Sequence, residues 1–133
     1  MMTFMTRKCF FRASFLALAA LGVAGCSESF APTPLNTSKA QEALKTTLEA
    51  WKKGDDITSL KNGSPAITAQ DLDWLGGAKL VGYQIQGDGK PVDSNLRASV
   101  ELTLKSSDGK DVVKTVNYLV TTSPSITVFR DIH

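Results

Sequence analysis

The chain has 133 residues, which is enough for one domain with a modest hydrophobic core and leaves no room for a second. Its formal charge is only +2, from 15 Lys and Arg against 13 Asp and Glu, and both signs are interspersed. Such a balance provides no basic field for nucleic acid and no polybasic patch for anionic lipid, so we expect no nucleic-acid binding.

The first 25 residues have the layout of a secretory signal. Arg7, Lys8 and Arg12 form a basic region without an acid, and residues 13–24 are apolar except for Ser14. A transmembrane anchor is disfavoured because a helix needs about 20 apolar residues to span a bilayer. A buried core helix is disfavoured because the run is apolar all round and not striped. We therefore interpret residues 1–25 as a signal peptide.

The signal ends in Val23-Ala24-Gly25-Cys26, which is an aliphatic residue, two small residues and a cysteine. This segment resembles the lipobox of bacterial lipoprotein precursors. The resemblance implies cleavage before Cys26, a thioether-linked diacylglycerol on its sulfur and often a third acyl chain on the new amine. Two or three such chains anchor a protein durably, at about 0.8 kcal/mol per buried methylene. Ser27 is not acidic, which in the well-studied sorting pattern favours the periplasmic face of the outer membrane.

Removal of residues 1–25 changes both the charge and the cysteine count. Fifteen Lys and Arg less the three in the signal leave twelve against thirteen acids, so the mature side chains sum to about −1. Cys9 is lost with the signal and Cys26 is the lipidation site, so the mature domain can form no internal disulfide. We expect it to rely on core burial and on sheet hydrogen bonds.

Residues 26–37 are interpreted as the lipidated cysteine and a flexible tether, because Pro32 and Pro34 oppose both helix and sheet. Residues 38–133 are predicted to form a single α+β domain. It begins with an amphipathic helix that Asn36, Thr37 or Ser38 caps and that Gly54 ends. The apolar stripe of this helix consists of Ala40, Ala43, Leu44, Leu48 and Trp51.

Between this helix and the long strands, the pattern predicts short elements. Asp55-Asp56 is interpreted as the cap of a short helical turn in preference to a metal site, and residues 65–71 as a short edge strand. Residues 71–77 lack the dense run of oxygen ligands that a calcium loop needs. We expect them to form a capped turn that tucks Leu72, Trp74 and Leu75 against the sheet.

Four strands are predicted at residues 79–86, 97–105, 112–121 and 126–130. The first places Val81, Tyr83 and Ile85 on one face and ends at residues 87–91. Two further apolar faces consist of Leu96, Ala98, Val100, Leu102 and Leu104, and of Val112, Val116, Tyr118 and Val120. The predicted fold class is α+β, with one amphipathic helix packed on a four-stranded antiparallel meander.

This order of elements is similar to cystatin-like and nuclear-transport-factor-2-like folds. The inhibitory Gln-x-Val-x-Gly hairpin of cystatins is not matched, since Gln84-Ile85-Gln86-Gly87 is one residue short and lacks Val. Nuclear-transport-factor-2-like enzymes usually have further helices that form a conical pocket, and this chain is short for such an arrangement. The likeness concerns the pattern of elements alone.

Few residues could carry chemistry. His133 is the last residue, so we expect no His-based triad and no zinc cluster, and the thiol of Cys26 is assigned to lipid. We predict no catalytic residues, no cofactor and no metal. Four aromatic side chains could face a ligand, although packing in the core is the favoured interpretation of the two tryptophans: Trp51, Trp74, Tyr83 and Tyr118.

The leading hypothesis is a membrane-tethered, non-catalytic binding or interaction lipoprotein of the bacterial cell envelope, held by lipid on Cys26 and meeting an envelope partner of unknown identity. The alternative is a small-ligand-binding or weakly enzymatic domain with a pocket between helix and sheet. A purely structural envelope protein is a third possibility that the sequence leaves open.

Overall fold

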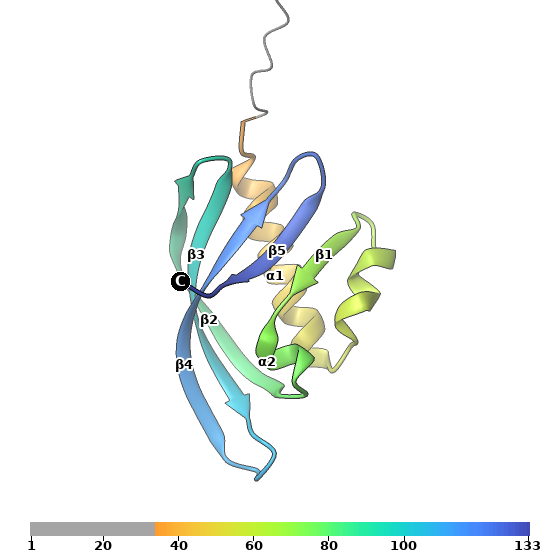
Figure 1. Cartoon of the computed structure of the whole chain (residues 1–133), viewed down its shortest axis with the longest axis vertical. Coiled ribbons are helices and arrows are strands. Elements are labelled where there is room, and N and C mark those ends of the chain that lie inside the picture. Colours follow the sequence, from red (N-terminus) through yellow and green to blue (C-terminus); the bar gives the residue numbers. More distant parts are fainter. Residues whose placement is uncertain (1–33) are drawn as a thin grey trace, which may run out of the picture. The chain divides into compact units, whose positions relative to one another are not determined.

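The computed structural model describes residues 34–133 (Figure 1). The predictions for the signal peptide, for Cys26 and for residues 26–33 of the tether therefore lie outside the described residues. In chain order the elements are helix α1 (Thr37–Lys53), 3-10 helix η2 (Ile57–Asn62), β1 (Ile67–Gln70), the short helix α2 (Leu72–Leu75), β2 (Lys79–Val92), β3 (Asn95–Lys105), β4 (Asp111–Thr121) and β5 (Ile126–Asp131).

The sheet has five strands in the order β1-β5-β4-β3-β2. Strands β2 to β5 form the expected antiparallel meander. The prediction of a four-stranded, wholly antiparallel sheet is nevertheless wrong, because the predicted edge strand joins the same sheet. Strand β1 pairs in parallel with β5, with Ile67 opposite Ile126 and Gln70 opposite Phe129. The helical segment and the meander between β1 and β5 supply the long connection that a parallel pair requires.

Local capping explains the ends of α1. The Asn36 side chain accepts a hydrogen bond from the backbone N–H of Lys39 at 3.0 Å, so Asn36 is the N-cap among the three expected candidates. Gly54 ends the helix with φ of +91°, and its N–H bonds to carbonyls of the last turn. The Asp56 side chain likewise accepts from Thr58 N and caps η2, as the sequence predicts.

The core lies between α1 and one face of the sheet, which we call the inner face. The predicted stripe of α1 is confirmed, since all five of its members are buried. They meet alternate residues of β3, which are also all buried: Leu96, Ala98, Val100, Leu102 and Leu104. The register places Tyr118 and Val120 of β4 on the same face, as expected. Figure 1 shows α1 on the far side of the sheet, behind the end of β4 and behind β5.

Strand β2 departs from the prediction at two places. Leu80 pairs with Leu104 and Gly82 with Thr103, so Val81 is an extra residue in a bulge. Leu80 is therefore buried and Val81 is 44 % exposed, the reverse of the prediction. Tyr83 and Ile85 share the inner face as expected, opposite Leu102 and Val100 of β3.

The second departure is the segment 87–89, which was predicted to end the strand. It forms a second irregularity between Gln86 and Lys90, after which β2 continues to Val92. Gly89 has φ of +80°, and a Cβ there would lie 3.0 Å from Leu96 Cδ1. The Asp88 carbonyl accepts a hydrogen bond from Gln41 Nε2 of α1 at 2.9 Å, so the irregular segment contacts the helix.

Candidate functional site: a depression beside two stacked tryptophans

Two of the four predicted ligand-facing aromatics lie together. Trp51 in the last turn of α1 and Trp74 in α2 stack with ring centroids 5.3 Å apart and planes within 3° of parallel. Trp51 faces inward because it belongs to the apolar stripe of α1. The sequence positions Trp74 through Asp71, whose Oδ1 accepts from the N–H groups of Asp73 and Trp74 at the start of α2.

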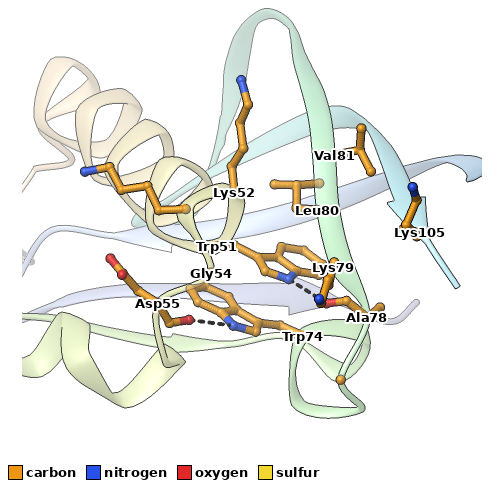
Figure 2. Close-up of a pocket in the computed structure, with 12 residues that line it drawn as sticks. Trp51, Lys52, Gly54, Asp55, Trp74, Ala78, Lys79, Leu80, Val81 and Lys105 are labelled. Carbon is orange, nitrogen blue, oxygen red and sulfur yellow. Dashed lines mark hydrogen bonds between the residues drawn. The ribbon is translucent and has the colours of Figure 1, made fainter. Parts of the chain in front are cut away.

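Both indole N–H groups donate to backbone carbonyls. Trp51 Nε1 donates to Ala78 O at 2.9 Å, and Trp74 Nε1 donates to Asp55 O at 3.2 Å (Figure 2). The stack thereby connects the end of α1, the short α2 and the start of β2. It also leaves neither indole donor free for a ligand.

A depression of about 580 Å³ lies beside this stack, and we call it the tryptophan depression. This volume is in the range of small-molecule sites. The lining combines apolar side chains with one acid and four lysines: Trp51, Lys52, Lys53, Gly54, Asp55, Trp74, Gly77, Ala78, Lys79, Leu80, Val81 and Lys105. Figure 2 shows that these residues come from the end of α1, the turn after it, α2, the start of β2 and the end of β3.

The two tyrosines do not line this depression. Tyr83 donates a hydrogen bond to Glu49 Oε1 of α1 at 2.6 Å. Burial, together with the hydrogen bond and the negative charge of Glu49, raises the pKa of Tyr83 to about 12. The hydroxyl is therefore a donor to the helix.

Tyr118 belongs to a second group, which we call the polar cluster: Asp71, Asp73, Lys114, Tyr118 and Arg130. Its hydroxyl donates to Asp71 Oδ2. Burial raises the pKa of Tyr118, and the charge of Asp71 and this hydrogen bond raise it further. Tyr118 is 1 % exposed, so it packs in the interior and the proton stays on its hydroxyl.

Ion pairs hold the rest of the polar cluster. Arg130 Nη1 donates to Asp71 Oδ1 at 2.9 Å and to Oδ2 at 3.0 Å, while Nη2 donates to Asp73 Oδ2 at 2.7 Å. Lys114 Nζ lies 2.9 Å from the same Asp73 oxygen. Burial opposes the charge of Arg130, but the hydrogen bonds and charge of Asp71 outweigh it and raise the pKa of Arg130. The two carboxylates are engaged by protein donors, which suits a structural role.

The prediction for residues 71–77 is thus partly wrong. The capped turn forms and Trp74 packs inward, but Leu72 is 62 % and Leu75 56 % exposed. Helix α2 has only four residues, so it cannot direct three large side chains to the sheet. Trp74 takes the inward position because it can stack on Trp51.

Sequence reasoning missed the lysines of the tryptophan depression and the pairing of Arg130 with Asp71. Lys52 and Lys53 lie in the last turn of α1, where positive charge suits the helix dipole, and Lys79 and Lys105 lie at strand ends. No spacing in the sequence connects them, because they come from three elements. The only signal in the sequence was that Asp71 could cap the turn. It predicted the turn but gave no indication of the side chains that bond to Asp71.

Two negative findings concern residues 34–133 only. In this part of the chain no three His, Cys, Asp or Glu side chains gather as metal ligands would. The helices described there are also too short or too polar for one of them to span a bilayer. Comparison of the chain with protein-family models, curated proteins and solved structures finds no match.

Proposed function

We propose that this chain is a membrane-tethered, non-catalytic binding lipoprotein of the bacterial cell envelope, and that the tryptophan depression is its binding surface. The observation that carries the proposal is the depression itself, which has the volume of a ligand site, an aromatic wall and ionisable groups at its rim. The tether and the lipid come from the resemblance of residues 23–26 to a lipobox.

The ionisable groups favour binding over catalysis. Around the depression they are Asp55 and four exposed lysines, which provide no pair of acids held in a cleft. The buried Asp71 and the partly buried Asp73 are bonded to Arg130 and Lys114. Their carboxylate oxygens accept hydrogen bonds from protein donors, and neither residue lines the depression.

The alternative places a ligand or a weak activity between the helix and the sheet. Between α1 and β3 that space is filled by tightly packed side chains, among which Leu44, Leu48, Val100 and Leu102 are at most 1 % exposed. The packing therefore favours the depression at the end of α1. The placement of α1 on the meander β2–β5 supports a loose likeness to cystatin-like folds, from which the parallel strand β1 departs.

The anchor is tested by replacing each cysteine in turn. A Cys26→Ala precursor should take up no radioactive palmitate and should remain uncleaved by the lipoprotein signal peptidase. The matched control is Cys9→Ala, which removes the other cysteine of the chain and should be labelled and processed as the wild type is. Normal processing of Cys26→Ala would refute the lipid anchor.

Binding at the depression is tested by nuclear magnetic resonance of the full-length protein purified in mild detergent. The chain has two tryptophans, so two indole N–H signals report on this site. We expect at least one fraction of a cell-envelope extract to shift both signals, and a Trp74→Ala variant to lose the response of the remaining indole. If no fraction moves either signal, the proposed binding surface is wrong.

A further inference from the structure

The tryptophan depression has a strong local excess of positive charge. Four lysines and one acid line it, although residues 34–133 carry twelve basic and twelve acidic side chains, which is fifteen less three and thirteen less Glu28. Lys52, Lys53 and Lys79 form no ion pair within the described part of the chain. Lys105 has only a 4.0 Å contact with the exposed Asp111.

Other depressions on the same surface lack this excess. The one of about 500 Å³ beside the outer face of α1 is lined by three acids and two lysines. The one of about 300 Å³ between α1 and Pro65 contains a single Lys and a single Glu. A surface on which charges are simply dispersed gives such mixed linings, so the lysines beside the two tryptophans are a specific feature of that depression.

The backbone at the end of α1 weakens this field without reversing it. A helix carboxyl end carries the equivalent of about half a negative charge. Together with Asp55 it offsets between one and two of the four lysine charges, and a net positive potential remains. Charge is also the means by which the lining can select a polar group, because both indole N–H groups already donate to Ala78 and Asp55.

The rest of the lining is apolar. Trp74 is partly exposed, Val81 is 44 % exposed because of the bulge, and Leu80 and Ala78 lie between them. A ligand that fits both parts has an anionic group for the lysines and a ring-sized apolar body for the tryptophan side. Aromatic and aliphatic surface of this kind contributes through burial at about 25 cal/mol per Å².

The depression lies far from the point at which the described chain enters the domain. It lies at the carboxyl end of α1, whereas the chain enters the domain at the amino end, at Asn36. The 17 residues of α1 separate the two ends by about 25 Å.

We propose that the tryptophan depression binds small soluble anions in which a carboxylate or phosphate is carried by a compact apolar ring. This inference rests on the proposed function, because it names the ligand class of that binding surface. The positive field of the four lysines attracts the anionic group, and the tryptophan side receives the ring.

Three probes with one ring test the charge requirement: indole-acetate, its neutral amide indole-acetamide, and the cation tryptamine. The readout is the shift of the two indole N–H signals of the full-length protein in mild detergent. We expect indole-acetate to bind about five-fold or more tightly than the amide, tryptamine to bind weakest, and the preference to shrink in high salt.

Matched lysine variants separate this field from general surface charge. Lys52→Gln with Lys79→Gln should lower the affinity for indole-acetate to about that for the amide. The control is Lys61→Gln with Lys90→Gln, two exposed lysines outside the depression, which should leave the preference unchanged. Circular dichroism of both double variants verifies the fold.

Three results would overturn the inference. Equal affinity for indole-acetate and its amide removes the anion requirement, while the proposed function survives if an envelope fraction still shifts both indole signals. A response to phosphatidylglycerol vesicles with none to indole-acetate makes the ligand a membrane lipid. If the preference for indole-acetate were lost in the control double variant as well, the preference would come from the overall charge of the protein surface and not from the depression.

Discussion

The inner face of the sheet is stabilised in two different ways along its length. Under α1 it is apolar, with Leu48 of the helix and Leu102 of β3 both fully buried. Under the short helix α2 it is polar, with Arg130 placed between Asp71 and Asp73. The two regions belong to one sheet but differ in the element that covers them.

The difference follows from the length of the covering helix. Helix α1 has 17 residues and presents a continuous apolar stripe, whereas α2 has four. A single turn cannot exclude water from a sheet face by apolar contact alone, so ion pairs and the Tyr118 hydroxyl connect it to β4 and β5. The stack of Trp51 on Trp74 is the contact between the two regions, and the tryptophan depression lies at that boundary.

The polar region should be the more sensitive to loss of one partner. Arg130→Met leaves the buried Asp71 without its guanidinium, and we expect the free energy of unfolding to fall by about 3–5 kcal/mol. The measurement is urea unfolding followed by circular dichroism. Lys105→Met is the control, because Lys105 lies 4.0 Å from Asp111 and both side chains are about half exposed, and it should cost about 1 kcal/mol or less. Equal losses would show that the polar cluster is not specially stabilising.

The apolar region should be destabilised by a cavity in its core. Leu48→Ala removes a side chain that is 0 % exposed, and we expect a loss of about 3 kcal/mol in the same unfolding measurement. Leu72→Ala makes the same chemical change on α2, where the side chain is largely exposed, and should change stability by about 0.5 kcal/mol or less. A large loss for Leu72→Ala would mean that Leu72 has a burial partner.

The two tyrosines allow a finer comparison. Tyr118→Phe removes a donor from the buried Asp71, and we expect a loss of about 1–2 kcal/mol. Tyr83→Phe removes a donor from Glu49, which is only partly buried and can take up water, so its loss should be smaller. If the order were reversed, the Tyr118 hydroxyl would be dispensable to the polar cluster.

The smallest expected effect is a dependence on alkaline pH. The pKa of Tyr83 is about 12 in the folded protein and near 10.0 without the fold, so the folded state keeps the proton longer. This contribution to stability is present below pH 10 and is lost as the pH rises towards 12. The free energy of unfolding, measured at several pH values across that window, should fall less steeply with rising pH for Tyr83→Phe than for the wild type. Superimposable curves would exclude the contribution.

Local signals predicted much of the fold. Gly54 ends α1 because a left-handed cap favours glycine, and Asp56 caps η2 because its carboxylate reaches the N–H of Thr58 two residues on. The alternation of β3 assigns its two faces correctly, since a strand with one buried side repeats every two residues. In these cases the partners lie within a few residues of each other.

Predictions failed where a distant strand decides the outcome. Val81 is displaced by a bulge whose register depends on pairing with β3, so Leu80 occupies the buried position. The edge strand β1 was expected, but its parallel partner β5 is remote in sequence and no local pattern indicates the direction of pairing. Leu72 and Leu75 are exposed because α2 ends after one turn.

The candidate site divides in the same way. The sequence alone determined that Trp51 faces inward, because the helical period places it on the apolar stripe, and that Asp71 begins a capped turn carrying Trp74. Only the tertiary structure decided that the two indoles stack, that Lys52, Lys79 and Lys105 surround one depression, and that Asp71 meets Arg130. The physical reason is that charge and aromatic contacts act across space between elements, whereas helical and strand periods record only which face of one element is buried.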